Sequence, residues 1–312
     1  MNISEFAQAI QKNVAQVVMG KADVVELMLV AMLAEGHILL EDVPGIGKTT
    51  LAKALARSID AKFSRIQFTP DLLPSDVTGI NYYNQKMQEF EYRSGPVFSQ
   101  ILLGDEINRA TPRTQSSLLE AMQEQQVTVD GETYSLPSPF LVIATQNPVE
   151  LEGTFPLPEA QLDRFLLQIA LGYPTLEEEN EILQRYVQQD PLVTLKAIIS
   201  PEQIIAFQRE VRDIYISEGL RHYILQVVRS TREHELVALG VSPRGTLALY
   251  RASQALAALS GRDYVIPSDV QRLCPPLLTH RIHISPQTRL RGRTPAQIVA
   301  EVAESVPVPI AE

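Results

Sequence analysis

A glycine-rich segment near the start of the chain combines residue types that bind phosphate. It closely fits the pattern G-x-x-x-x-G-K-[ST], in which glycines let backbone N–H groups approach phosphate oxygens. Lys48 is therefore expected to reach the β- and γ-phosphates, and the Thr49 hydroxyl to bind Mg²⁺. Asp42 stands where the pattern has its first glycine, but Gly45 and Gly47 still allow the turn. The expected nucleotide contacts are Pro44, Gly45, Ile46, Gly47, Lys48, Thr49 and Thr50.

Two adjacent acidic residues end an apolar run further along the chain. Asp105 and Glu106 follow Ile101-Leu102-Leu103-Gly104, which is typical of a buried strand. Carboxylates in this position cost free energy unless they meet a cation or solvent. Alone, the pair could be a surface turn after a strand. Beside a phosphate loop, Asp105 is expected to hold Mg²⁺ through water, and Glu106 to polarise the water that attacks the γ-phosphate.

Apolar spacing predicts the elements that must position these residues. The strands are short, apolar and unbroken, as in parallel sheets, and they alternate with helices, which predicts a parallel α/β fold. The phosphate loop would join the first strand to a helix, so that the positive end of the helix faces the anion. The predicted strands are 37–41, 101–103 and 141–144, and the predicted helices are 3–18, 22–35, 49–59, 113–125 and 159–165.

The pattern becomes almost entirely helical in the second half of the chain. We therefore expect two domains, residues 1–174 and 175–312, with four or five helices in the second. Polar alternation and turn residues predict two hairpins inside the first domain, at 79–97 and 126–137. The second hairpin contains an Asp-Gly pair, which is a strong hairpin signal between alternating runs.

The composition is that of a globular protein, with 45% hydrophobic residues among 312. There are 37 acidic and 27 basic residues, and the net charge of −10 argues against duplex DNA as a partner. The only cysteine, Cys274, excludes an internal disulfide and a cysteine-rich zinc site, and we expect a buried thiol. The N-terminus has no leader pattern. The longest apolar stretch, 24–34, carries Glu26 and is too short for a membrane span, so we expect a cytoplasmic protein.

Longer runs around these motifs are more specific than the phosphate loop alone. They cover residues 39–49, 67–76, 105–110, 144–148 and 152–165. Through these runs the chain resembles the AAA+ ATPases and, within them, the MoxR family. The resemblance implies a P-loop NTPase (AAA+) fold, with a five-stranded parallel-sheet core followed by a C-terminal all-helical lid. It also implies ATP and Mg²⁺ as cofactors.

The same resemblance implies roles for single polar residues. Asn147 resembles the sensor-1 residue, whose carboxamide can donate to the γ-phosphate and orient the attacking water. Otherwise it is a turn-forming asparagine. Arg164 resembles the arginine finger that reaches the ATP of the next subunit, with Arg109 and Arg113 as rivals. Otherwise Arg164 is a helix-surface arginine paired with Asp163 or Glu159.

Arg244 resembles the sensor-2 residue of the lid. Ser242 and Pro243 fit the N-cap and the first position of a helix, so Arg244 falls in the first helical turn. A cation there opposes the helix dipole by roughly 0.3–1 kcal/mol, a penalty that a nearby polyphosphate would reverse. The alternative is a solvated arginine. The family's adenine contacts correspond to Val18, Met19 and Gly20, which could equally pack in a core.

The two hairpins match the helix-2 and presensor-1 inserts of this AAA+ branch, which face the ring pore in family members. Tyr82 and Tyr83 are candidate partner contacts, although tyrosine is also a common strand residue. The implied function is an ATP-hydrolysing, usually hexameric machine that matures, activates or assembles client proteins, often with von Willebrand factor type A domains. The alternatives are a magnesium-chelatase-type motor subunit, a DNA-directed motor and a nucleotide-binding scaffold without turnover.

Overall fold

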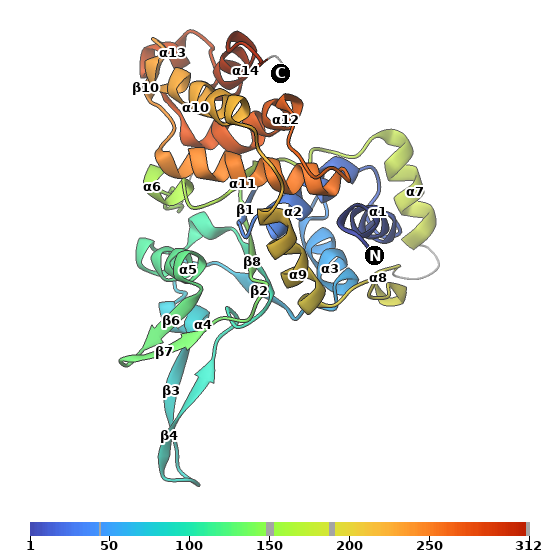
Figure 1. Cartoon of the computed structure of the whole chain (residues 1–312). Helices are drawn as coiled ribbons and strands as arrows, with labels where there is room; N and C mark the ends of the chain where they lie inside the picture. The colour runs from blue at the N-terminus through green and yellow to red at the C-terminus, as the bar shows by residue number, and fades with distance from the viewer. Residues whose placement is uncertain (44, 148–152, 187–190, 310–312) are drawn as a thin grey trace.

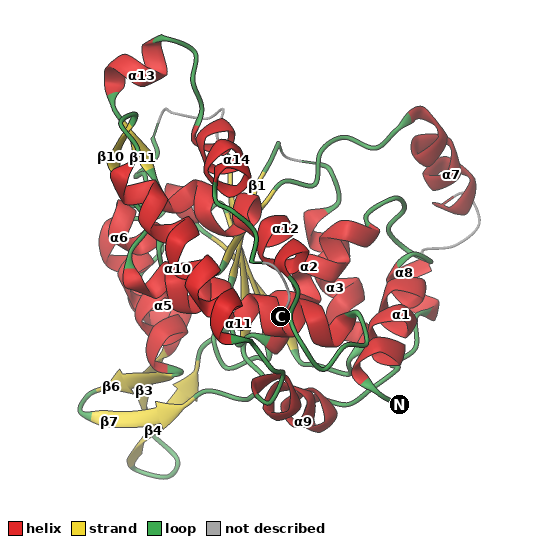
Figure 2. Cartoon of the chain, turned by 45° about the horizontal axis from the view of Figure 1, so that its top comes forward, coloured by secondary structure: helices red, strands yellow, loops and turns green. Residues whose placement is uncertain are grey.

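The computed structural model describes residues 1–43, 45–147, 153–186 and 191–309 (Figure 1). Pro44, one of the expected nucleotide contacts, lies outside these residues. Helices flank a central sheet, and a mostly helical part follows it along the chain (Figures 1 and 2). None of the described helices has both the length and the apolar character needed to cross a membrane.

The sheet at the centre of the first half has five strands. They are β1 (Ile38–Glu41), β2 (Phe63–Gln67), β5 (Ile101–Asp105), β8 (Leu141–Gln146) and β9 (Leu167–Ile169). All neighbours pair in parallel in the order β2-β5-β8-β1-β9, which confirms the predicted parallel α/β core. The apolar pattern did not predict β2 or β9, because β2 contains polar side chains and β9 has only three residues.

Helices cover both faces of this sheet (Figure 2). They are α1 (Ile3–Val14), α2 (Ala22–Leu33), α3 (Lys48–Ser58), α4 (Pro74–Thr78), α5 (Pro112–Glu124) and α6 (Glu159–Leu162), with a 3-10 turn η1 (Ile107–Arg109). Strand side chains alternate between two apolar cores. Ile38 and Leu103 belong to the core that contains α2 and α3, whereas Leu39 and Leu102 belong to the core that contains α5. The sheet is therefore buried on both faces, which leaves its edges and the connecting loops for contact with ligands.

Two antiparallel hairpins extend from this core. β3 (Gly79–Asn84) pairs with β4 (Glu89–Ser94), and β6 (Gln126–Val129) pairs with β7 (Glu132–Ser135). The β3–β4 hairpin projects away from the sheet (Figure 1). At its base, a Cβ on Gly95 would lie 2.3 Å from the carbonyl oxygen of Val77. Glycine is required there because the two ends of the hairpin approach so closely.

The second half is mostly helical and packs on α1 and α2. Its elements are α7 (Leu176–Tyr186), α8 (Pro191–Thr194), α9 (Pro201–Arg212), α10 (Glu218–Glu233), α11 (Pro243–Leu259), α12 (Pro267–Leu278), η2 (Thr279–Arg281), α13 (Pro286–Leu290) and α14 (Pro295–Ser305), with a short antiparallel pair formed by β10 (Val237–Leu239) and β11 (His283–Ile284). Cys274 is fully buried, as predicted, and burial raises the pKa of its thiol to about 12. Buried residues of α2 and α11 belong to one apolar cluster, so a division at residue 174 stays a prediction.

Candidate functional site

The glycine-rich loop joins β1 to α3 at the carboxyl edge of the sheet. Gly45 and Gly47 have φ values of +87° and +93°, in the left-handed region that favours glycine. A Cβ at either position would meet no atom within 4 Å, so the backbone angle, and not lack of space, demands glycine. α3 begins at Lys48 directly after this turn, and its first N–H groups have no partners within the helix. This geometry suits an anion at the helix N-terminus.

Lys48 lies between the loop and the acidic strand ends. Its Nζ donates to the carbonyl oxygen of Asp42 at 2.8 Å. Burial lowers the pKa of Lys48, whereas the charges of Asp42, Asp105 and Glu106 raise it. The side chain is therefore a partly buried ammonium group close to three carboxylates. Phosphate oxygens bound in the loop would give it a further anionic partner.

Asp105 is buried at the end of β5 and has partners on both neighbouring strands. Arg65 of β2 donates from Nε to Asp105 Oδ2 at 2.6 Å. Thr145 of β8 donates from its hydroxyl to Oδ1 at 3.3 Å. The Arg65 side chain is 49% exposed, so it can move into solvent and release the carboxylate to another cation.

Glu106 has an unusual backbone conformation and two side-chain partners. Its φ of +57° is rare for a non-glycine residue, and its N–H donates to Thr145 Oγ1 at 2.9 Å. The carboxylate Oε2 accepts a hydrogen bond from Gln67 Nε2 at 2.7 Å and lies 3.1 Å from Arg109 Nε. The expected base is therefore held by groups of its own chain.

Arg65, Gln67 and Thr145 are polar contacts that the sequence interpretation missed as site residues. Their link to Asp105 and Glu106 arises because β2 and β8 flank β5, which no residue spacing reveals. Alternation along β2 places Arg65 and Gln67 on the same face of the strand. The sequence offered one local indication of a role for Arg65 and Gln67: both are polar residues in a strand that also contains Phe63 and Ile66.

One cavity of about 310 Å³ brings most of the expected residues together. Thr49 and Asp105 contribute hydroxyl and carboxylate oxygens, the hard donors that suit Mg²⁺. In the part of the chain that the structure describes, no three His, Cys, Asp or Glu side chains form a metal-binding group. These residues therefore fit a Mg²⁺ ion that takes its remaining ligands from phosphate and water. The cavity is lined by Gly45, Gly47, Lys48, Thr49, Thr50, Arg65, Gln67, Asp105, Glu106, Thr145 and Asn147.

A second cavity, of about 450 Å³, adjoins the first and shares part of the loop. Val18 and Met19, two of the expected adenine contacts, line it together with Ile46 and Tyr173. Gly20 does not line it. Its φ is +65°, and a Cβ there would overlap the carboxylate of Glu178 in α7. The apolar lining and the position beside the loop suit a purine base.

Neither cavity is lined by Arg164 or Arg244. Arg244 is exposed in the first turn of α11, and its Nη2 donates to Gln123 Oε1 of α5 at 3.4 Å. Arg164 follows α6. Of the rival fingers, Arg109 lies beside Glu106 of its own chain, and Arg113 is exposed at the start of α5. The expected finger, Arg164, and the expected sensor-2 residue, Arg244, are therefore not among the residues that line these two cavities.

Comparisons with known proteins agree with this architecture. Residues 37–167 match the ATPase family associated with various cellular activities (AAA), and residues 229–302 match the AAA lid domain. The chain is 43% identical to Chaperone MoxR1 of Mycobacterium tuberculosis over 306 residues, covering 95% of this chain and 81% of that protein. It is 53% identical to Uncharacterized protein YeaC of Bacillus subtilis over 299 residues, covering 96% and 93% of the two chains. A crystal structure of a proposed ATPase from Cytophaga hutchinsonii has a TM-score of 0.93 and 39% sequence identity, covering 99% of this chain and 96% of that one.

Proposed function

Because this chain belongs to the MoxR family of AAA+ ATPases, we propose that it hydrolyses ATP in an oligomeric ring and uses the cycle to mature, activate or assemble client proteins. One observation carries the proposal: a single cavity collects Lys48, Thr49, Asp105, Glu106 and Asn147. A phosphate cradle alone would suit a scaffold. A carboxylate and a carboxamide facing the same cavity add the groups that activate and orient water.

Each of these residues has a separate task in the proposed reaction. Lys48 binds the phosphates, and Asn147 donates to the γ-phosphate. When bound, Mg²⁺ would neutralise charge at the phosphates, with the Thr49 hydroxyl as a ligand and Asp105 holding the ion through water. Glu106 accepts the proton of the attacking water. Gln67 and Arg109 both contact Oε2 of its carboxylate and hold the group beside the cavity.

The ring explains two arginines that line neither cavity of their own chain. We assign Arg164 and Arg244 to the ATP of the neighbouring subunit, Arg164 as the finger and Arg244 as the sensor-2 cation. Both stabilise the negative charge that spreads over the phosphates during transfer. The oligomer is a hexamer in this proposal, and each active site lies at a subunit boundary.

The projecting β3–β4 hairpin supplies the proposed client contacts. Tyr82 and Tyr83 are 41% and 51% exposed, and Phe90 on the paired strand is 74% exposed. Exposed aromatic residues provide contact area at low cost in side-chain entropy. Proteins with von Willebrand factor type A domains are the proposed partners, and the cytoplasm is the proposed location.

Replacing Lys48 with alanine weakens ATP binding. The ammonium group lines the same cavity as the loop. A charge-assisted hydrogen bond contributes about 1.5–3 kcal/mol, which corresponds to an affinity loss of roughly tenfold to 100-fold. Isothermal titration with a slowly hydrolysed ATP analogue measures the change. Lys53→Ala, at an exposed position of the same helix, is the matched control and keeps the original affinity. Equal affinities for the two variants would contradict the assigned role of Lys48.

Replacing Tyr82 and Tyr83 with alanine lowers the stimulation of ATP hydrolysis by a client. Tyr82 donates its hydroxyl to Glu91 Oε2 at 2.6 Å and Tyr83 packs edge-on against Phe90, so both rings stay on the hairpin surface. The measured quantity is the ratio of stimulated to basal turnover, with a client recovered on a Glu106→Gln trap. We expect this ratio to fall towards one. Tyr215→Ala, an exposed tyrosine of the helical part, is the control. An unchanged ratio would remove the tyrosines from client contact.

A further inference from the structure

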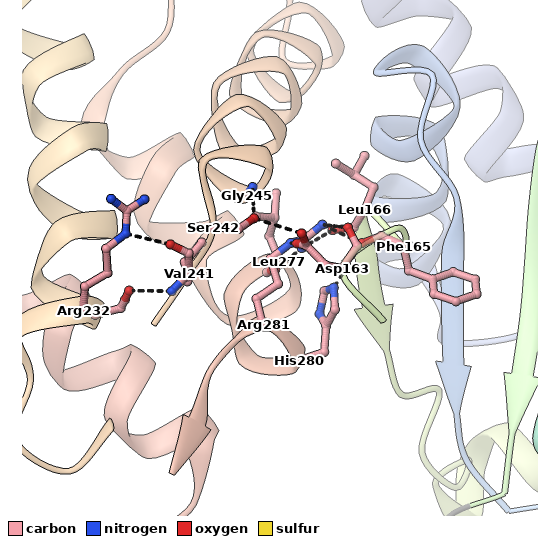
Figure 3. A network of polar contacts seen from close by, with 11 residues as sticks. Asp163, Phe165, Leu166, Arg232, Val241, Ser242, Gly245, Leu277, His280 and Arg281 are labelled. Atoms are coloured by element: carbon pink, nitrogen blue, oxygen red, sulfur yellow. Dashed lines mark hydrogen bonds and ion pairs between the residues drawn. The ribbon is translucent and has the colours of Figure 1, made fainter. Parts of the chain in front are cut away.

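Arg281 is a charged side chain that is almost completely buried and that lines neither nucleotide cavity. Its side chain is 2% exposed, and its Nε lies 2.8 Å from Asp163 Oδ1. The guanidinium also donates to the carbonyl oxygens of Phe165 at 2.6 Å and Leu166 at 3.0 Å (Figure 3). Removing an ion pair from water costs several kcal/mol unless the remaining donors find partners, and here they do.

These contacts join two parts of the chain that are distant in sequence. Asp163 and Arg281 are 118 residues apart, and Arg281 belongs to η2, next to α12. A further contact between the same parts is made by His280, whose Nε2 lies 3.0 Å from the carbonyl oxygen of Phe165. The segment that follows α6 is therefore held by side chains of the helical part.

The second oxygen of Asp163 holds the start of α11. Ser242 donates its hydroxyl to Asp163 Oδ2 at 2.9 Å, and the same hydroxyl accepts from the N–H of Gly245 at 3.3 Å, as an N-cap does. A Cβ on Gly245 would lie 3.0 Å from Arg281 Cδ, so glycine lets the first turn of α11 pack directly on the arginine. Figure 3 shows Ser242, Asp163 and Arg281 joined by dashed lines in one network.

The network is adjacent in sequence to both arginines assigned to the neighbouring subunit. Arg164 is the residue after Asp163, and carbonyl groups on both sides of it accept from Arg281, including that of Asp163 at 3.4 Å. Arg244 lies in the α11 turn that Ser242 caps. Asp163, one of the two acids that a surface ion pair of Arg164 could use, thus pairs with Arg281.

We propose that Asp163, Ser242 and Arg281 form a latch that positions Arg164 and Arg244 as one unit, so that both arginines reach the ATP of the neighbouring subunit together. The latch rests on the proposed function, because that function assigns the two arginines to the neighbour. Asp163, Ser242 and Arg281 are positioning residues in this scheme and do not touch ATP. Arg164 lies on the segment that leads into the sheet, but Arg281 of the helical part binds the backbone carbonyl groups on both sides of it. In this scheme, movement of the helical part therefore moves Arg164.

The pKa of Arg281 reflects the short distance between the charged groups of the latch. The pKa of Arg281 is lowered to about 10, chiefly by burial and to a smaller extent by the nearby charge of Arg244, whereas the charge and hydrogen bond of Asp163 raise it. Arg244 is therefore close enough to Arg281 for their charges to interact. The carboxylate of Asp163 opposes this positive charge in the network.

The test replaces Asp163 with asparagine, which has the same size but no charge, in the full-length protein. We expect kcat to fall by about tenfold to 100-fold, since a misplacement of about 1 Å costs about 100-fold. The KM for ATP changes less than about twofold, because the cavity of the variant's own chain is intact. Mixing Asp163→Asn with Lys48→Ala restores turnover, since the Lys48→Ala subunits supply correctly held arginines to the intact cavities.

The control removes a similar pair that is remote from both arginines. Asp269 is 7% exposed and pairs with Arg262 at 2.6 Å inside the helical part. We expect Asp269→Asn to lower the thermal unfolding temperature and to leave kcat unchanged. Equal losses of kcat in the two variants would show that Asp163 has only a structural role and would overturn the latch.

Arg164→Ala separates failure of the latch from failure of the proposed function. If mixing with Lys48→Ala restores Arg164→Ala but not Asp163→Asn, the latch is wrong and the shared active site stands. If mixing restores neither variant, Arg164 does not act on the ATP of the neighbouring subunit, and the latch proposal is wrong as well. If Asp163→Asn does not fold, Ser242→Ala removes only one hydroxyl of the network. Its expected result is a several-fold loss of kcat that mixing reverses, and an unchanged kcat would overturn the proposal.

Discussion

Replacing Glu106 with glutamine stops ATP turnover but leaves ATP bound. General-base catalysis contributes about 10²–10⁴ to a rate, so we expect kcat to fall by at least about 100-fold. An amide cannot accept the proton of the attacking water, but it keeps the size of the carboxylate and can still accept a hydrogen bond from Gln67. Phosphate release in the steady state measures turnover, and isothermal titration measures ATP affinity.

The matched control for this prediction is Glu120→Gln. Glu120 is an exposed glutamate of α5 and lines neither cavity, so its variant is expected to hydrolyse ATP at the original rate. Hydrolysis by Glu106→Gln near that rate would remove Glu106 from the mechanism. If the prediction holds, the variant stays in an ATP-bound state, and affinity purification with mass spectrometry can identify the clients that it retains.

Replacing Arg164 with alanine lowers kcat by about 10³–10⁵, the range that arginine fingers supply in related phosphoryl transfers. ATP binding to the subunit's own cavity is retained, because Arg164 does not line it. Mixing Arg164→Ala with Lys48→Ala restores part of the activity. Each variant is defective alone, but at a mixed interface one supplies an intact cavity and the other supplies an intact finger.

The mixing experiment also separates Arg164 from its rivals. Arg109 lies 3.1 Å from Glu106 of the same chain, so any loss in Arg109→Ala arises in the variant's own cavity. Mixing Arg109→Ala with Lys48→Ala would then give no recovery, since every cavity carries one of the two defects. Arg113→Ala provides the comparison at an exposed site on α5. Absence of recovery for Arg164→Ala at every ratio, in oligomers shown to be mixed, would exclude its action on the neighbouring subunit.

The turns, helix starts and buried strands follow from short stretches of sequence. Gly45 and Gly47 adopt positive φ values that other residues disfavour, and α3 starts directly after them. Apolar runs became buried strands, and Pro201, Pro243 and Pro267 each begin a helix. These features depend on neighbouring residues, because backbone angles, capping and burial periodicity act over a few positions. The resemblance of longer runs then sufficed to identify the family.

Long-range contacts were decided only by the tertiary structure. Gln67 reaches Glu106 because β2 lies beside β5, an order set by packing of the whole sheet. Asp163 meets Arg281 across 118 residues because the helical part folds back on the segment after α6. The sequence shows each of these polar residues but not its partner. A buried charge can be satisfied by many different groups, and only the packing of distant elements decides which group lies within hydrogen-bonding distance.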